Sequence, residues 1–278
     1  MTTFPNAPTE MESPRLKTGT IDGLYWEVHD GLPGAPSVIL SAGLGGSAHF
    51  WSPQMEALKD YRVILYDHRG TGRSERRLKP DHSVAAMGGD IVAVLDATGT
   101  DRAHLVGHAA GGNAGLQLAL DHPDRLDRLV VVNGWSRPDP HVARCFKART
   151  RLLEAFGPIA YIEAQSLFLY PPDWISENDA LLKAQDARHV AGFPRTDVML
   201  ARIGALLAFD IDDRLGEIPH RVLISASADD MLVPPLLSRR LAEGLPNAVL
   251  DVTPWGGHAF TATAADVFNA RLVAFLRD

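Results

Sequence analysis

Short apolar runs alternate with amphipathic stretches along most of this chain. Six runs have the length and composition of buried strands, at residues 37–42, 62–66, 103–106, 128–132, 221–226 and 248–252. Helical periodicity follows most of them, at residues 51–59, 84–97, 110–120, 236–243 and 265–276. Alternating continuous apolar strands and helices are typical of a parallel sheet covered on both faces. We therefore predict an α/β fold with a mostly parallel central sheet, preceded by one longer strand at residues 20–29.

The pattern changes between residues 135 and 209. No buried-strand run occurs there, and helical periodicity punctuated by prolines takes its place. This interval is predicted to be a helical lid inserted into the fold. The α/β core then comprises residues 20–134 and 210–278, and the polar residues 1–19 form an N-terminal tail.

Composition and charge narrow the class of protein. The chain has 278 residues, 46% of them hydrophobic and 22% charged, which is ordinary for a globular protein. The net charge of −7 argues against a nucleic-acid partner, which would favour a basic stripe. Apolar runs are too short to span a membrane, and the N-terminus does not resemble a signal peptide. The single cysteine, Cys145, allows no intrachain disulfide, so a cytoplasmic protein is expected.

Chemistry-bearing residues follow three of the predicted strands. The sequence Gly-His-Ala-Ala-Gly at residues 107–111 has the setting of a nucleophile elbow, Gly-x-Ser-x-Gly, with Ala109 at the central position. Asp230 follows the strand at 221–226, and His258 follows the strand at 248–252. The chain order of elbow, acid and histidine is that of an α/β-hydrolase. Asp229 is the adjacent competitor for the role of the acid.

Further motifs resemble the α/β-hydrolase superfamily and span residues 37 to 258. Residues 40–43 resemble its oxyanion loop, and residues 67–74 match its Asp-x-Arg-Gly-x-Gly-x-Ser turn. The resemblance implies an α/β-hydrolase fold with a helical lid, with His258 and Asp230 as catalytic residues. The backbone N–H groups of Leu44 and Ala110 would form the oxyanion hole.

The predicted lid resembles a narrower group, the RutD family of the pyrimidine-utilisation pathway. The residues that carry this resemblance lie at 133–135, 144–146, 163–165, 167–171 and 173–174. It implies a hydrolase of carbamate or 3-aminoacrylate in uracil degradation. The family's elbow also tends to read Gly-His-Ala, which implies that Ala109 is the natural residue.

Ala109 excludes an acyl-enzyme, because alanine has no oxygen nucleophile. Three interpretations remain open. His258 activates water directly, with Asp230 orienting its ring. Alternatively, the protein is non-catalytic and binds a small metabolite or a pathway partner. In the third, the chain is an inactivated variant of a serine hydrolase.

Binding residues are expected in the lid. Both implied substrates carry a carboxylate, which needs a cation when it is buried. Arg144 on the first lid helix is our candidate for that cation, with Arg69 behind it. Trp135 and Tyr170 are the candidate aromatic residues of the substrate pocket.

Other motifs are assigned structural roles. Asp67 is expected to bind the N–H groups of its own turn, and His108 to pack beside the elbow. Cys145 lacks the setting of a nucleophile. Residues 43–48 fit a dinucleotide fingerprint weakly, but the bulky residues after them oppose a phosphate. We therefore expect no metal and no cofactor, a small-molecule substrate as the partner, and a surface compatible with a homodimer.

Overall fold

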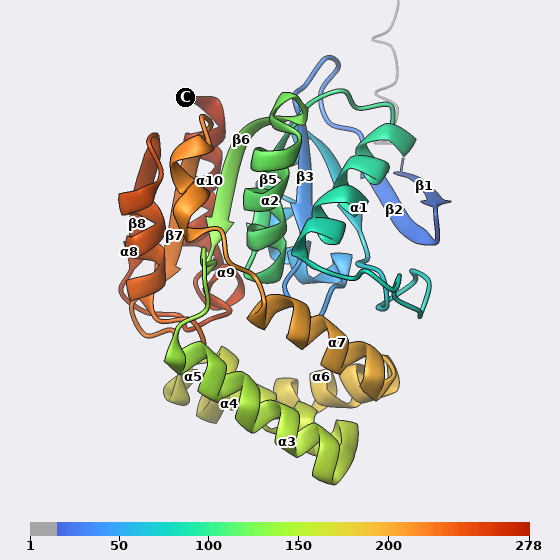
Figure 1. The fold of residues 1–278 in the computed structure, drawn as a ribbon, viewed down its shortest axis with the longest axis vertical. Coiled ribbons are helices and arrows are strands. Elements are labelled where there is room, and N and C mark those ends of the chain that lie inside the picture. Colours follow the sequence, from blue (N-terminus) through green and yellow to red (C-terminus); the bar gives the residue numbers. More distant parts are fainter. Residues whose placement is uncertain (1–15) are drawn as a thin grey trace, which may run out of the picture.

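The computed structural model describes residues 16–278, which form one eight-stranded sheet flanked by helices (Figure 1). The strand order is β1-β2-β4-β3-β5-β6-β7-β8, antiparallel from β1 to β4 and parallel from there to β8. The strands are β1 Leu16–Ile21, β2 Leu24–His29, β3 Ser37–Ser41, β4 Arg62–Tyr66, β5 Ala103–His108, β6 Leu126–Val132, β7 Arg221–Ser227 and β8 Ala248–Thr253.

The helices of the core lie between and after these strands. They are α1 Val84–Ala97, α2 Ala110–Asp121, α8 Pro235–Gly244, α9 Phe260–Thr263 and α10 Ala265–Arg277, with short 3₁₀ helices η1 Ala48–Gln54, η2 Pro123–Arg125 and η3 Asp212–Glu217. The predicted parallel α/β-hydrolase fold is confirmed by this topology.

Two expected elements differ from the structure. The single strand expected at residues 20–29 is a hairpin, because Asp22 and Gly23 both take positive φ, 52° and 76°, and turn the chain back. Strand β1 therefore includes residues 16–19, which were expected in the tail, while residues 1–15 lie outside the described part. The helix expected at 51–59 is the 3₁₀ helix η1, which begins at the Ser47 cap and contains Pro53.

The core lies on both faces of the sheet. Alternate residues of the central strands point to opposite sides, so Ile39 and Ile64 pack under one helical layer while Val38 and Val63 pack under the other. Helices α1, α2 and α8 cover the first face, and η1 and α10 cover the second. This double cover explains why the strands appear in the sequence as continuous apolar runs.

The turn between β5 and α2 brings helix and sheet into close backbone contact. A Cβ built on Gly111 would lie 2.1 Å from the carbonyl oxygen of Ser41, and one on Gly107 would lie 2.4 Å from Gly111. Only glycine fits at both positions. The close approach fixes the start of α2 against the carboxyl end of β3.

A lid of five helices connects β6 to β7. These are α3 Pro140–Glu163, α4 Gln165–Leu169, α5 Pro172–Glu177, α6 Asp179–Ala191 and α7 Thr196–Leu207, with a kink in α3 at Gly157. Figure 1 shows them gathered at one end of the sheet, where the parallel strands end. The N–H of Ile211 donates to the carbonyl of Ser136 over 3.0 Å, which brings the two ends of the lid together.

Gly111→Ala is expected to destabilise the protein by more than about 3 kcal/mol, because its methyl group would displace rigid backbone. Gly89→Ala is the matched control. Gly89 lies on the exposed side of α1 with nothing near its Cβ position, so alanine there should stabilise by about 0.5–1 kcal/mol. Urea unfolding of the two variants and wild type measures both effects. Equal stabilities of the two variants would contradict the close-approach argument.

Candidate active site

His258 and Asp230 form a buried hydrogen-bonded pair beyond the carboxyl ends of β8 and β7. The distance from His258 Nδ1 to Asp230 Oδ2 is 2.7 Å. The other carboxylate oxygen, Oδ1, accepts hydrogen bonds of 2.8 Å from the N–H groups of Leu232 and Val233. The fixed carboxylate therefore keeps the proton of a neutral His258 on Nδ1 and leaves Nε2 as the acceptor.

Asp229 positions the loop that carries His258. Its carboxylate accepts hydrogen bonds from the N–H groups of Gly257 (2.9 Å) and Gly256 (3.2 Å). Both glycines have positive φ, and a Cβ on Gly257 would lie 2.8 Å from the carbonyl oxygen of Leu169 in the lid. The two adjacent acids thus have different tasks. Asp230 contacts the imidazole, and Asp229 shapes the turn before it.

The backbone carbonyl of His258 is held by two buried side chains. Asn133 Nδ2 donates to it over 2.7 Å, and His108 Nε2 donates over 2.9 Å. The His108 ring also packs against His258 and Phe50, with ring centroids 4.6 Å apart in both contacts. The predicted packing role of His108 is confirmed by these contacts, and its hydrogen bond also holds the loop that carries His258.

Ala109 occupies the strained position of the elbow. Its φ is 46° and ψ is −107°, a conformation that places the residue at the sharp strand-to-helix turn. The N–H of Ala110 begins α2 and donates no hydrogen bond within residues 16–278. The N–H of Leu44 likewise has no acceptor in the described chain. The elbow geometry is therefore present with a methyl group where a serine hydroxyl would stand.

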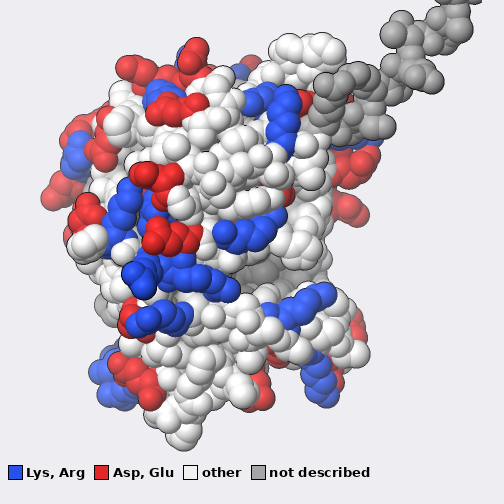
Figure 2. Space-filling model, turned by 90° about the vertical axis from the view of Figure 1, so that its right-hand side faces the viewer, with Lys and Arg blue, Asp and Glu red and all other residues white. Residues whose placement is uncertain are grey.

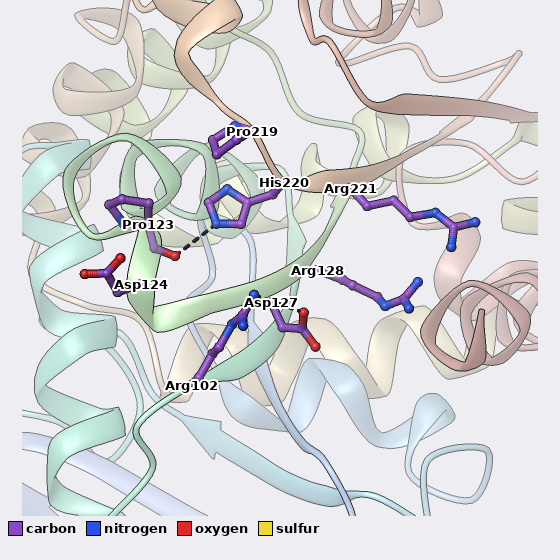
Figure 3. A pocket seen from close by; sticks show the side chains of 8 residues that line it. All are labelled: Arg102, Pro123, Asp124, Asp127, Arg128, Pro219, His220 and Arg221. Atoms are coloured by element: carbon purple, nitrogen blue, oxygen red, sulfur yellow. Dashed lines mark hydrogen bonds and ion pairs between the residues drawn. The ribbon is translucent and has the colours of Figure 1, made fainter.

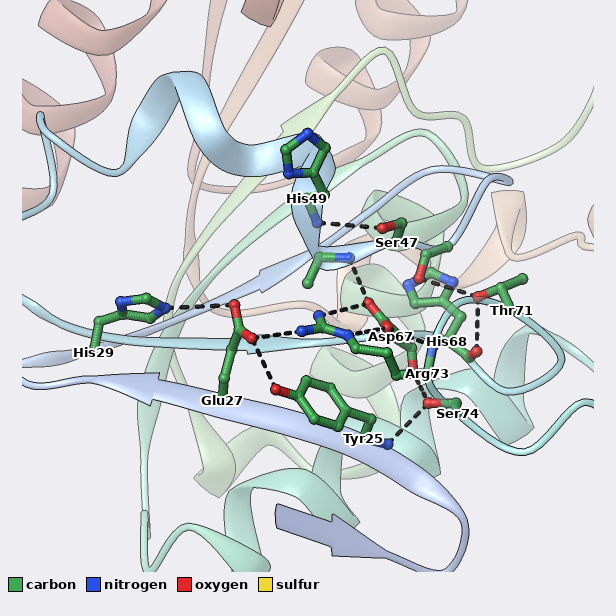
Figure 4. Close-up of polar contacts among 12 residues, drawn as sticks. Tyr25, Glu27, His29, Ser47, His49, Asp67, His68, Thr71, Arg73 and Ser74 are labelled. Atoms are coloured by element: carbon green, nitrogen blue, oxygen red, sulfur yellow. Dashed lines mark hydrogen bonds and ion pairs between the residues drawn. The ribbon is translucent and has the colours of Figure 1, made fainter. Parts of the chain in front are cut away.

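Asp67 organises the turn after β4 (Figure 4). Its oxygens accept hydrogen bonds of 2.8 Å from the N–H groups of Ala48 and Arg73, and Arg73 Nε donates to the same carboxylate. A Cβ on Gly72 would strike the Asp67 carboxylate at 2.4 Å. The structural role predicted for Asp67 is thus confirmed. Its hydrogen bonds connect the start of η1, which follows the predicted oxyanion loop, to the turn after β4.

The lid residues expected at the substrate lie in different settings. Trp135 is 1% exposed, and its indole Nε1–H has no partner in the described structure. The ring of Tyr170 stacks on Trp174 with centroids 4.5 Å apart, and its backbone lies beside Gly257. Burial raises the pKa of the Tyr170 phenol. Tyr170 therefore borders the loop that carries His258, whereas Trp135 packs in the hydrophobic core.

The prediction for Arg144 needs correction. Arg144 is exposed, on the side of α3 opposite the buried Val142, Phe146 and Leu153. The apolar side of α3 packs against the rest of the protein, and Arg144 lies on the exposed side. Arg69, the second candidate, is buried but already forms an ion pair of 3.0 Å with Asp90.

Two buried arginines of the lid were missed. Arg149 of α3 and Arg202 of α7 are 3% and 2% exposed. Both stand on the apolar side of their helices, where Arg149 follows Phe146 by three residues and Arg202 follows Val198 by four. An arginine in an apolar helical stripe is a signal the sequence contains, and it distinguishes these two from Arg144.

The described chain also has a pocket at the other end of the sheet from the His258–Asp230 pair. A pocket of about 640 Å³ lies at the opposite ends of β5, β6 and β7 and is bordered by His220, whose Nε2 donates to the carbonyl of Pro123 (Figure 3). Figure 2 shows one face on which basic and acidic side chains are interspersed. No helix among residues 16–278 is long and apolar enough to cross a membrane. Among the described residues, no three or more His, Cys, Asp or Glu side chains are grouped so that they could hold a metal ion.

A fixed Asp–His pair, a strand–turn–helix elbow and a glycine-rich loop at one end of a mostly parallel sheet define the α/β-hydrolase class. The sequence pattern of the alpha/beta hydrolase fold matches residues 36–261. Among solved structures, an enol-lactonase from Burkholderia xenovorans LB400 is 26% identical, with a TM-score of 0.84, over 94% of this chain and all of that one. A hydrolase from Pseudomonas aeruginosa PA01 has a TM-score of 0.83 at 26% identity, over 94% of this chain and 98% of its own.

Curated relatives are more similar in sequence. A Caulobacter sp. (strain K31) protein named "Putative carbamate hydrolase RutD" is 64% identical over 94% of this chain and 98% of its own length. A protein of the same name from Variovorax paradoxus (strain S110) is 53% identical over 91% and 96%. The chain belongs to the RutD family of α/β-hydrolase-fold proteins.

The stability of the protein should fall as the pH drops below neutral. Burial, with the neighbouring His258 as a smaller cause, lowers the pKa of His108 to about 3. Burial likewise lowers the pKa of His82 to about 4. An unfolded histidine titrates near 6.5, so the unfolded chain binds the extra protons between about pH 6.5 and these lower values. The contribution of these two histidines to the free energy of unfolding is fully present above about pH 6.5. Below that pH, each of them lowers the free energy of unfolding by up to about 1.4 kcal/mol per pH unit.

Urea unfolding between pH 4 and 7 measures this dependence. His108→Gln should show a shallower fall than wild type, whatever its stability at pH 7. An unchanged slope would contradict the inference that His108 stays neutral in the folded protein.

Proposed function

We propose that this protein hydrolyses a small carbon–nitrogen substrate, carbamate or 3-aminoacrylate, with water activated by His258. The observation that carries the proposal is the 2.7 Å contact of His258 with Asp230 beside an elbow that bears Ala109. The pair retains the geometry of a general base, while the residue it would activate in a serine hydrolase has no hydroxyl. The printed name of the curated relatives supports the substrate class.

The proposed reaction needs one water and no covalent intermediate. His258 Nε2 accepts a proton as water attacks carbon, and the same ring returns the proton to the leaving nitrogen. From carbamate the products are ammonia and bicarbonate. For 3-aminoacrylate, a proton added to carbon 2 gives the imine, water adds to carbon 3, and ammonia leaves to give 3-oxopropanoate. On carbamate, the N–H groups of Leu44 and Ala110 would stabilise the oxyanion.

Ammonia release from freshly prepared carbamate or 3-aminoacrylate should be faster with the enzyme than without it. His258→Ala should lower the enzymatic rate by about a hundredfold or more, because the general base is lost. The measurement follows ammonia from the first seconds, since both compounds also decompose unaided. His122→Ala is the control, because His122 is exposed at the end of α2.

The control should keep the wild-type rate. Equal rates for wild type, His258→Ala and the enzyme-free reaction would refute the catalytic proposal. They would leave a protein of this fold that binds a small metabolite or a pathway partner without turnover.

Ala109→Ser is expected to create a weak esterase. The backbone at position 109 already has the strained elbow conformation, and His258 and Asp230 are in place to activate a hydroxyl. An activated acetate ester should give a burst of leaving group, with the acetyl adduct on residue 109 detected by mass spectrometry. The double variant Ala109→Ser/His258→Ala should show no burst. A serine that never acylates, in a variant that keeps the His258–Asp230 contact, would show that Nε2 does not reach the elbow.

A further inference from the structure

The lid holds two buried positive charges that lack a carboxylate partner. Arg69, Arg149 and Arg202 are the three buried arginines in the described part of the chain. Arg69 is paired with Asp90. Neither Arg149 nor Arg202 has an ion pair with any residue from 16 to 278. Each also has a buried Nε–H without a hydrogen-bond partner.

Arg202 lies against the oxyanion loop. Its Nη2 donates to the carbonyl of Leu44 over 3.0 Å and approaches His68 Nδ1 at 3.1 Å, and its Nη1 donates to the carbonyl of Arg69. These partners are neutral, so they orient the guanidinium without balancing its charge. Burial lowers the pKa of Arg202 to about 10, and the carboxylate that acts on it from further away, Asp90, is engaged by Arg69.

Arg149 lies among aromatic rings of the lid. Its guanidinium carbon is 4.7 Å from the ring centre of Tyr161 and 5.6 Å from that of Phe168. Its one hydrogen bond goes to the neutral Gln165 side chain, over 3.1 Å. Burial raises the pKa of the Tyr161 phenol, and the positive charges of Arg149 and Arg202 both act to lower it. Both charges therefore act on one phenol.

Both arginines adjoin the elements that carry the catalytic groups. Arg202 touches Leu44, whose N–H is the expected oxyanion donor. Phe168, under Arg149, precedes Leu169, whose carbonyl accepts a hydrogen bond of 2.9 Å from the N–H of Ala259 beside His258. An isolated buried cation is costly, and an anion on its unused donors removes most of that cost.

We propose that Arg149 and Arg202 form an anion subsite under the lid that binds the carboxylate of the substrate. This inference rests on the proposed function for the identity of the substrate. The subsite lies on lid helices, and the base and elbow lie on the core. The subsite therefore fits 3-aminoacrylate, whose carboxylate is separate from its reacting carbon: the carboxylate would face the lid and carbon 3 would face His258. Tyr161 links the two lid helices, since its ring centre is 4.7 Å from the guanidinium carbon of Arg149. Its hydroxyl contacts Met199 Sδ on the helix of Arg202.

Propionate and propionamide test the subsite, because they have the same shape and differ in charge. Dissociation constants are measured by NMR titration at constant ionic strength, without turnover. Wild type should bind propionate at least about tenfold more tightly than propionamide, since hydrogen bonds to charged groups are the stronger ones. Arg149→Gln and Arg202→Gln should each lose about tenfold or more in propionate affinity. Binding of propionamide should not change.

Arg144→Gln is the matched control, an exposed arginine on the same helix as Arg149, and it should bind propionate like wild type. Arg202→Lys keeps the charge and should retain more affinity than Arg202→Gln. If Arg202→Gln does not fold, Arg149→Gln decides the question. Propionate binding that survives in folded Arg149→Gln, or equal binding of propionamide by wild type, overturns the subsite. Because binding is measured without turnover, a failure of the catalytic proposal can be told apart from a failure of the subsite.

Discussion

The close contact of helix α2 with strands β3 and β5 is the constraint on which the site depends. Gly107 and Gly111 allow the backbones of helix and strand to touch there. The carbonyl oxygen of Ser41 lies so close to Gly111 that no Cβ fits at that position. The contact accompanies the sharp turn at Ala109, and α2 begins directly after it at Ala110. The elbow therefore keeps its backbone conformation with alanine at position 109, because backbone packing maintains the turn and the side chain does not.

His258 is held as firmly as the elbow. Asp230 fixes its ring, Asp229 shapes the turn before it, and the side chains of Asn133 and His108 hold its carbonyl. These partners come from three strand ends, so the position of His258 depends on the whole sheet. An imidazole fixed in this way would lose little entropy if it acted as the general base proposed above.

The lid is connected to the core through the same groups that would bind and convert a substrate. The carbonyl of Leu169 contacts the loop of His258, and Arg202 contacts the carbonyl of Leu44. Of the two buried lid arginines, Arg202 contacts the oxyanion loop, whereas the contacts of Arg149 lie within the lid. An anion bound by both, as proposed, would therefore connect the interior of the lid with the oxyanion loop.

The sequence by itself determined the parallel strands, the lid, the elbow and the order of Asp230 and His258. Each of these leaves a local signal, either an apolar period or a turn motif next to a strand. The sequence periodicity places Arg149 on the apolar side of its helix and Arg144 on the opposite side, but only the tertiary structure shows what Arg149 contacts there. Both lie on one predicted helix, and the periodicity shows its apolar face without showing what that face covers. The different contacts of Asp229 and Asp230 were also decided only by the tertiary structure. They depend on which carboxylate contacts the backbone of the loop after β8 and which contacts the His258 ring.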